Sequence, residues 1–170
     1  MNRPEKSEYG EYYERYISLV ADENVEDLLA LQPAKLRELF APIGEDRGTF
    51  AYDEGKWTLK EVLSHLIDGE RIFAYRILRI SRGDETPIEG FEQDGYIENS
   101  NANNRSFAEL LDEFDLQRRS NMLLINNLSD EASKRLGTAS DFSVSVRALV
   151  YISAGHVQHH AAILKERYAI

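Results

Sequence analysis

The chain has 170 residues and a mass of 19.5 kDa, with 42% hydrophobic and 29% charged residues. This length and composition fit a single globular domain spanning residues 1–170 and exclude an intrinsically disordered chain. The formal net charge is −10, and the basic residues are scattered rather than clustered. Such a chain would repel a phosphate backbone, so we expect no nucleic acid among its partners.

The chain contains no cysteine, which excludes disulfide bonds, thiolate metal sites and a cysteine nucleophile. Residues 1–10 are polar and lack the apolar stretch of a signal peptide. The longest nearly apolar run, residues 148–155, is too short to cross a bilayer. We therefore expect a cytoplasmic protein with no membrane partner.

The first part of the chain predicts two helices. Tyrosine and aliphatic residues recur at helical spacing over residues 9–20, where we expect an amphipathic helix. Residues 22–24 interrupt this pattern, and Asn24 is suited to cap a second helix over residues 25–40. Pro33 lies inside that second segment and, lacking an N–H group, should kink the helix or begin a new one.

The third predicted helix has the clearest signals. Thr58 is followed three residues later by Glu61, which is the spacing of a capping box. Apolar residues then repeat every three or four positions for about six turns, until Gly83 and Pro87 end the pattern.

The remaining chain predicts a long loop and two further helices. Residues 88–104 are polar, and a loop of this length in a compact domain is often functional. Ser106 and Glu109 form a second capping box, before a helix that continues to Leu128. The last helix is expected over residues 143–168. Long amphipathic helices bury their apolar stripes against one another, so we predict an all-α fold, a four-helix bundle.

Three of the four histidines lie within residues 155–160. On a helix, His156 and His160 lie about 40° apart and one turn along the same apolar face, where two imidazoles can chelate one divalent ion. A hydrogen-bonded core histidine is the alternative interpretation, although each neutral buried ring then needs partners for both nitrogens. His159 lies about 60° to the other side of His156, and helical spacing does not exclude it as the ligand.

The fourth histidine, His65, borders the apolar stripe of the third predicted helix, from which it could reach the last helix. Asp68, Glu70 and also His159 are the candidate catalytic residues, as groups that transfer protons. Glu70 falls on the core face, where it would accept a hydrogen bond from an imidazole or pair with Arg76 or Arg118. The combined pattern predicts a site with three histidine nitrogens.

Three segments carry a resemblance to a known family. They are GKWTLKEVLSHLIDGERIFAYR at residues 55–76, GFEQDGY at residues 90–96 and GHVQHH at residues 155–160. Their sequence and order resemble the DinB-like, or YfiT-like, superfamily of damage-inducible metalloproteins, which is unrelated to the translesion polymerase of the same name. The resemblance runs from about Tyr9 to Tyr168.

The resemblance implies a bundle with up-down-down-up connections and a metal held by His65, His156 and His160. It leaves His159 as a neighbour that faces the ligands or the substrate. Imidazole suits zinc, nickel, iron or copper, and we expect zinc or nickel, with iron and manganese as alternatives. Some members of the family transfer low-molecular-weight thiols or isomerise thiol adducts, which makes such a thiol a candidate substrate here.

Three imidazoles leave a coordination position open, which is typical of catalytic metal sites. We therefore expect a metal-dependent enzyme acting on a small molecule, either a hydrolase or a thiol S-transferase. The alternative is a non-catalytic bundle that binds metal or a stress-related partner. The resemblance and the tyrosines Tyr12 and Tyr16 also favour a homodimer.

The loop at residues 88–104 is expected to form a wall of the metal site, because it offers aromatic and polar groups such as Phe91, Asp94 and Tyr96. About 22 Å of helix separates His65 from the root of this loop. The loop can reach back to the histidine only if it is extended, so it wraps the bundle, belongs to the site of a dimer partner, or is a solvated connector with no role in the chemistry.

Overall fold

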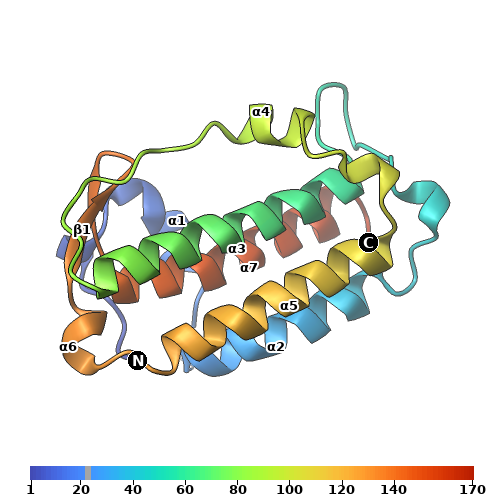
Figure 1. Cartoon of the computed structure of the whole chain (residues 1–170). Helices are drawn as coiled ribbons and strands as arrows, with labels where there is room; N and C mark the ends of the chain where they lie inside the picture. The colour runs from blue at the N-terminus through green and yellow to red at the C-terminus, as the bar shows by residue number, and fades with distance from the viewer. Residues whose placement is uncertain (22–23) are drawn as a thin grey trace.

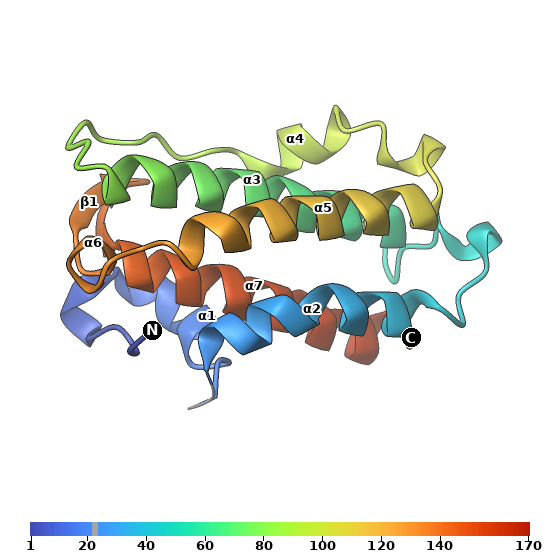
Figure 2. The same cartoon turned by 60° about the horizontal axis from the view of Figure 1, so that its bottom comes forward.

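The computed structural model describes residues 1–21 and 24–170. Its long elements form a four-helix bundle, as expected, made of α2 (Val25–Phe40), α3 (Leu59–Ser81), α5 (Phe107–Ile125) and α7 (Val146–Arg167). Helix α3 packs against α5 and α7, and α2 packs against the same two helices (Figure 1). Helices α2 and α7 run in one direction, while α3 and α5 run in the other (Figures 1 and 2).

The expected capping residues begin the long helices. The hydroxyl of Thr58 accepts a hydrogen bond from the amide of Glu61, whose carboxylate accepts one from the amide of Thr58 in return. Ser106 and Glu109 make the same pair of bonds at α5. Asn24 caps α2, whereas the other residues of the expected break, 22 and 23, lie outside the described residues. Local sequence therefore sets these starts, since each cap satisfies amides that the helix leaves free.

Helix α2 continues through Pro33 as one element, so no new helix begins there. A proline cannot donate to the carbonyl four residues earlier, which here belongs to Leu29. The Leu29 carbonyl instead accepts a hydrogen bond of 2.8 Å from Nη1 of Arg118, a buried side chain of α5. A side chain from a neighbouring helix thus replaces the missing backbone donor.

The helix expected over residues 9–20 is much shorter in the structure. Two 3₁₀ turns, Lys6–Glu8 and Glu11–Tyr13, precede a four-residue α1 (Glu14–Ile17). Gly10 separates the turns with an extended backbone, and a Cβ atom there would lie 2.6 Å from the ring of Phe142. The expected segment is therefore a 3₁₀ turn followed by one turn of α-helix, and residues 18–20 lie outside the helix.

A β-hairpin stands where the last helix was expected to begin, so the prediction of an all-α chain is wrong in this detail. The short α6 (Asp130–Ser133) leads into antiparallel strands β1 (Leu136–Ala139) and β2 (Phe142–Ser145). The two turn residues between the strands, 140 and 141, both have positive φ, which matches a tight hairpin turn. Helix α7 therefore begins at Val146, capped by Ser145.

The expected loop at residues 88–104 contains two short helical elements, α4 (Gln93–Glu98) and a 3₁₀ turn at Ala102–Asn104. Ile88 pairs with Ala139 of β1, which fixes the start of the segment to the hairpin. The chain then runs back along α3 towards the beginning of α5 (Figure 1). Helix α5 ends at Ile125, three residues before the expected Leu128.

The interior of the bundle has two apolar clusters with a polar layer between them. One cluster gathers around the hairpin, α1 and the first half of α7, and the other around the starts of α3 and α5. Buried polar side chains occupy the middle of the bundle: Gln32, His65, Glu70, Arg118, Ser153 and His156. No helix in the described part of the chain is both long and apolar enough to span a membrane.

Candidate metal centre

The structure brings His65 of α3 together with His156 and His160 of α7. The three residues offer nitrogen atoms that all lie within 4.8 Å of one another. The Nε2 atoms of His65 and His156 are 2.9 Å apart, and these two side chains are only 3% and 6% exposed. The ring of His160 lies 4.7 Å from each of the other two, measured between centroids.

Two glycines make room for this cluster. A Cβ atom on Gly69 of α3 would lie 3.0 Å from Cε1 of His156, closer than ordinary packing allows. A Cβ atom on Gly155 would overlap the carbonyl oxygen of Tyr16, so this glycine lets α1 pack directly on α7. The Tyr16 ring then meets the rings of His156 and His159 edge-on, at 5.5 and 5.4 Å between centroids.

The environment keeps the three imidazoles neutral. Burial lowers the pKa of His65 to about 4, with a smaller contribution from His159. Burial and the neighbouring imidazoles lower the pKa values of His156 and His160 well below the usual range. Neutral rings carry the lone pairs that bind a metal, so the donor set fits a divalent ion such as zinc, whose bonds to histidine are about 2.0–2.1 Å.

A cavity of about 390 Å³ opens beside the cluster, and His65 and His156 form part of its wall. Aromatic side chains make up much of the remaining wall: Tyr12, Tyr13, Tyr16, Phe73, Phe91 and Phe142. Gly90 to Gln93 also line it, so the segment after α3 contributes to the wall of the cavity that His65 and His156 line. This segment runs back along α3 (Figure 1).

Glu70 lies in the polar layer but not in the wall of this cavity. Arg118 donates to its two carboxylate oxygens at 2.8 and 2.7 Å, and Ser153 and Asn121 donate as well. Burial raises the pKa of Glu70, but the charge and hydrogen bonds of Arg118 outweigh this effect and leave the pKa lowered. Of the two expected interpretations, Glu70 is half of a buried ion pair, and its oxygens are occupied by these donors.

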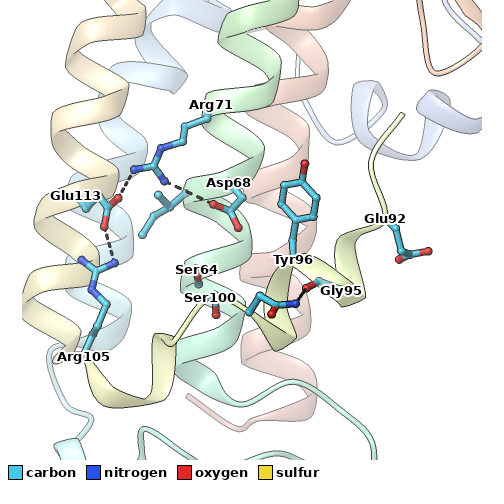
Figure 3. Close-up of a pocket in the computed structure, with 11 residues that line it drawn as sticks. Ser64, Asp68, Arg71, Glu92, Gly95, Tyr96, Ser100, Arg105 and Glu113 are labelled. Atoms are coloured by element: carbon cyan, nitrogen blue, oxygen red, sulfur yellow. Dashed lines mark hydrogen bonds and ion pairs between the residues drawn. The ribbon is translucent and has the colours of Figure 1, made fainter. Parts of the chain in front are cut away.

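Asp68 faces a second cavity, of about 700 Å³, between α3, α4 and the start of α5. It pairs with Arg71 at 3.5 Å, and Arg71 also contacts Glu113, which binds Arg105 (Figure 3). Burial raises the pKa of the Asp68 carboxyl. The structure therefore places Asp68 away from the cavity that His65 and His156 line.

His159 lies next to the cluster without lining the cavity. Its ring centroid is 5.1 Å from that of His160, and the side chain is half-buried. Burial lowers its pKa, with a further contribution from Arg15 of α1. Among the expected proton-transfer residues, His159 is the one whose ring contacts a histidine of the cluster.

Sequence reasoning missed Arg76 as a residue of the cavity and considered it only as a partner for Glu70. The signal was present, because His65, Gly69, Phe73 and Arg76 follow one another at intervals of four, four and three residues on one face of α3. The contribution of Phe142 and Ser140 could not be found in this way, since the hairpin that carries them was not expected.

Comparisons with known proteins agree with this architecture. The chain matches YfiT from Bacillus subtilis with a TM-score of 0.77 and 19% sequence identity, over 99% of this chain and 92% of that one. YfiT is described as a probable metal-dependent hydrolase with an unusual four-helix bundle topology. A comparison with curated sequences gave no match. The family profile of the DinB superfamily matches residues 28–164, and on this evidence the chain belongs to the DinB superfamily.

Proposed function

We propose that the protein is a metal-dependent hydrolase that acts on a small organic molecule, with a divalent ion held by His65, His156 and His160. The observation that carries this proposal is the position of the histidine cluster, which is buried in the bundle yet forms part of a cavity wall. The description of YfiT as a probable metal-dependent hydrolase supports the same reaction class.

The number of ligands favours catalysis over simple metal storage. Within the described residues, the cluster joins three side chains and includes no carboxylate or fourth histidine. A three-histidine set leaves a position for water or substrate, whereas structural zinc sites are closed by four protein ligands. A divalent ion held there would lower the pKa of a bound water molecule to about 7. Zinc or nickel is the ion that we propose.

The chain's own residues supply binding and proton transfer. The aromatic wall excludes bulk water and holds an apolar portion of the substrate. Of the expected proton-transfer residues we retain His159, which lies outside the cavity wall but whose ring contacts those of His160 and of Tyr16, a residue that lines the cavity. Glu70 has a structural role instead, since its oxygens already accept hydrogen bonds from Arg118 and Ser153.

The metal assignment can be tested by elemental analysis of untagged protein. We expect one zinc or nickel ion for each chain in the wild type and in His159→Ala, and loss of stoichiometric metal in His156→Ala. His159→Ala is the matched control, because it removes a neighbouring imidazole from the same helix. Full metal content in His156→Ala would contradict the proposed ligand set.

The reaction class can be tested by comparing two substrate panels on the metal-loaded protein. One panel contains esters and amides, and the other combines small thiols with electrophiles. We expect turnover of the first panel, and its loss in His156→Ala. Turnover confined to the second panel would replace the hydrolase by a thiol transferase, and turnover of neither panel would favour a non-catalytic bundle.

We also propose that residues 1–170 form one domain with up-down-down-up helix order and that the protein pairs into a homodimer. Tyr12 is 50% exposed, beside the half-buried Tyr16, and could form part of such a contact. Light scattering at micromolar concentration should give twice the mass of the chain. A mass of one chain would contradict the dimer.

A further inference from the structure

Arg76 is a buried cation in the wall of the aromatic cavity. Its side chain is 2% exposed, and it lies on α3 with His65 and Phe73. Its Nη2 atom donates to the carbonyl of Glu89 at 3.1 Å and to the hydroxyl of Ser140 at 2.7 Å. Its Nε atom is buried and has no hydrogen-bond partner among the described residues.

Within residues 1–21 and 24–170, this guanidinium forms no ion pair with a carboxylate, and both oxygens that accept its hydrogen bonds are neutral. Glu92 also lines the cavity, but it is exposed, and its carboxylate caps α4 by accepting from the amide of Asp94 at 3.0 Å. A buried charge without a partner is unfavourable, and arginine cannot remove its charge by deprotonation.

The cavity joins this cation to the histidine cluster. His65 and Arg76 project from the same face of α3, with roughly 16 Å of helix between their Cα atoms. Gly69 and Phe73 line the cavity between them, and Tyr13, Phe91 and Phe142 complete the apolar surroundings. A molecule that reaches from one end to the other meets the histidines, then an aromatic wall, then the guanidinium.

We propose that Arg76 binds an anionic oxygen group, a carboxylate or a phosphate, of a substrate whose apolar body lies against the aromatic wall. The guanidinium suits both groups, because its charge strengthens each hydrogen bond to an anionic oxygen and its Nε–H has no acceptor among the described residues. This proposal rests on the proposed function in treating the anion as part of a substrate. It also gives the orientation of that substrate, with the reacting group at the histidines and the anionic group at Arg76.

Arg76 also has a structural use, since its two hydrogen bonds connect α3 to the segment after it and to the hairpin turn. The test must therefore separate anion binding from the stability of this connection. Arg79→Gln is the matched control, because Arg79 also connects α3 to the segment after it, through Asp84 and Thr86, but does not line the cavity. Arg76→Lys keeps the charge and loses the guanidinium donors, and Arg76→Gln loses both.

The test is calorimetric binding of three probes to protein freed of metal by a chelator, so that no probe can bind through the metal. The probes are phenylacetate, phenyl phosphate and the neutral phenylacetamide. For the wild type and Arg79→Gln, we expect at least one anionic probe to bind about tenfold or more tightly than the amide. Arg76→Gln should remove this preference, and Arg76→Lys should retain only part of it.

The proposal would be overturned if the wild type bound the anionic and neutral probes equally. It would also be overturned if none of the three probes bound. The comparison between probes needs only wild-type protein, so it decides the question even if Arg76→Gln does not fold. Of the two anions, the tighter one identifies the group. Metal analysis distinguishes the failure of this inference from the failure of the proposed function. If the protein prefers the anions but lacks stoichiometric metal, only the proposed function is refuted. If it binds metal but shows no preference for the anions, only this inference is refuted.

Discussion

Arg118 and Arg76 are both buried guanidinium groups, at 1% and 2% exposure, but their surroundings differ. Arg118 donates to Glu70 through two bonds and to Gln32 and the Leu29 carbonyl through its third nitrogen. Arg76 meets two neutral oxygens, and its Nε has no partner in the described part of the chain. Arg118 lies in the polar layer and borders a separate cavity between α2 and α5, whereas Arg76 lines the cavity that His65 and His156 also line.

The comparison separates structural from functional buried polar groups. Burial and charge are similar for the two arginines, so neither property distinguishes them. The presence of partners does, because a complete set of hydrogen bonds leaves nothing for a ligand, and an incomplete set beside a cavity leaves donors available. The three histidines follow the second pattern, with ligand nitrogens that lie within 4.8 Å of one another beside the cavity.

The largest expected effect comes from removing a partner of Arg118, whose hydrogen bonds are complete. Glu70→Ala leaves Arg118 as an uncompensated buried charge, and we expect the free energy of unfolding to fall by about 3–5 kcal/mol. Urea denaturation measures this change. Stoichiometric zinc should still bind to the folded variant, because Glu70 does not line the cavity.

A double variant, Glu70→Leu with Arg118→Met, tests the cause of that loss. It removes both charges, so it should be more stable than Glu70→Ala. If the free energy of unfolding of Glu70→Ala fell by less than about 1 kcal/mol, the Glu70–Arg118 ion pair would be as weak as an exposed one. The contrast with Arg76 would then be lost.

The next largest effect concerns the histidine cluster, because a bound metal would supply the partner that its nitrogens lack. Zinc at a hundred times its dissociation constant should raise the free energy of unfolding by about 2.7 kcal/mol. Thermal or urea denaturation with and without a chelator measures the difference. His65→Ala should lose this stabilisation and His159→Ala should keep it, whereas equal stabilisation of both variants would show that zinc binds elsewhere.

Gly155→Ala tests how closely the cavity wall depends on the packing of α1. The added Cβ would overlap the Tyr16 carbonyl, so we expect a loss of about 1–3 kcal/mol in the free energy of unfolding. Gly95→Ala in α4 is the control, since nothing lies within 4 Å of its added Cβ. It should be neutral or slightly stabilising. Similar losses in both variants would contradict the role of Gly155 in close packing.

The smallest expected effect is a change in the free energy of unfolding with pH, which arises from Glu70. Its pKa in the folded chain lies below the ordinary value of 4.5, so the unfolded chain binds more protons. The contribution of Glu70 is therefore complete above about pH 4.5 and is lost as the pH falls below it. The slope for this group is at most about 1.4 kcal/mol per pH unit, and urea denaturation of Glu70→Gln should lack it.

Features set by neighbouring residues could be predicted from the sequence. The capping boxes at Thr58 and Ser106 involve residues three positions apart, and both form in the structure. His156 and His160 lie one turn apart, so any helix places them on one face. The pattern also predicted that His65 meets the last helix in a three-histidine site. The resemblance to the family was needed to leave His159 out of the ligands, because helical spacing did not exclude it.

Features that depend on distant contacts could not be predicted. The helix expected over residues 9–20 was wrong in its extent, since only Glu14–Ile17 is α-helical, and Gly10 before it is extended and packs against Phe142 of an unexpected hairpin. That hairpin was missed because its turn, Ser140 and Asp141, lacks the glycine typical of such turns. The lack of a partner for Arg76 likewise follows from which groups surround it in three dimensions.

Pro33 has a consequence for the motions of the bundle. Because the Leu29 carbonyl takes its donor from Arg118, 89 residues later in the chain, α2 cannot complete its own backbone hydrogen bonding at this point. Opening α2 there exposes both that carbonyl and a charged side chain held by Glu70. Amide protons around Pro33 should therefore exchange with solvent only when α2 and α5 separate, so that the two helices protect each other as one cooperative unit.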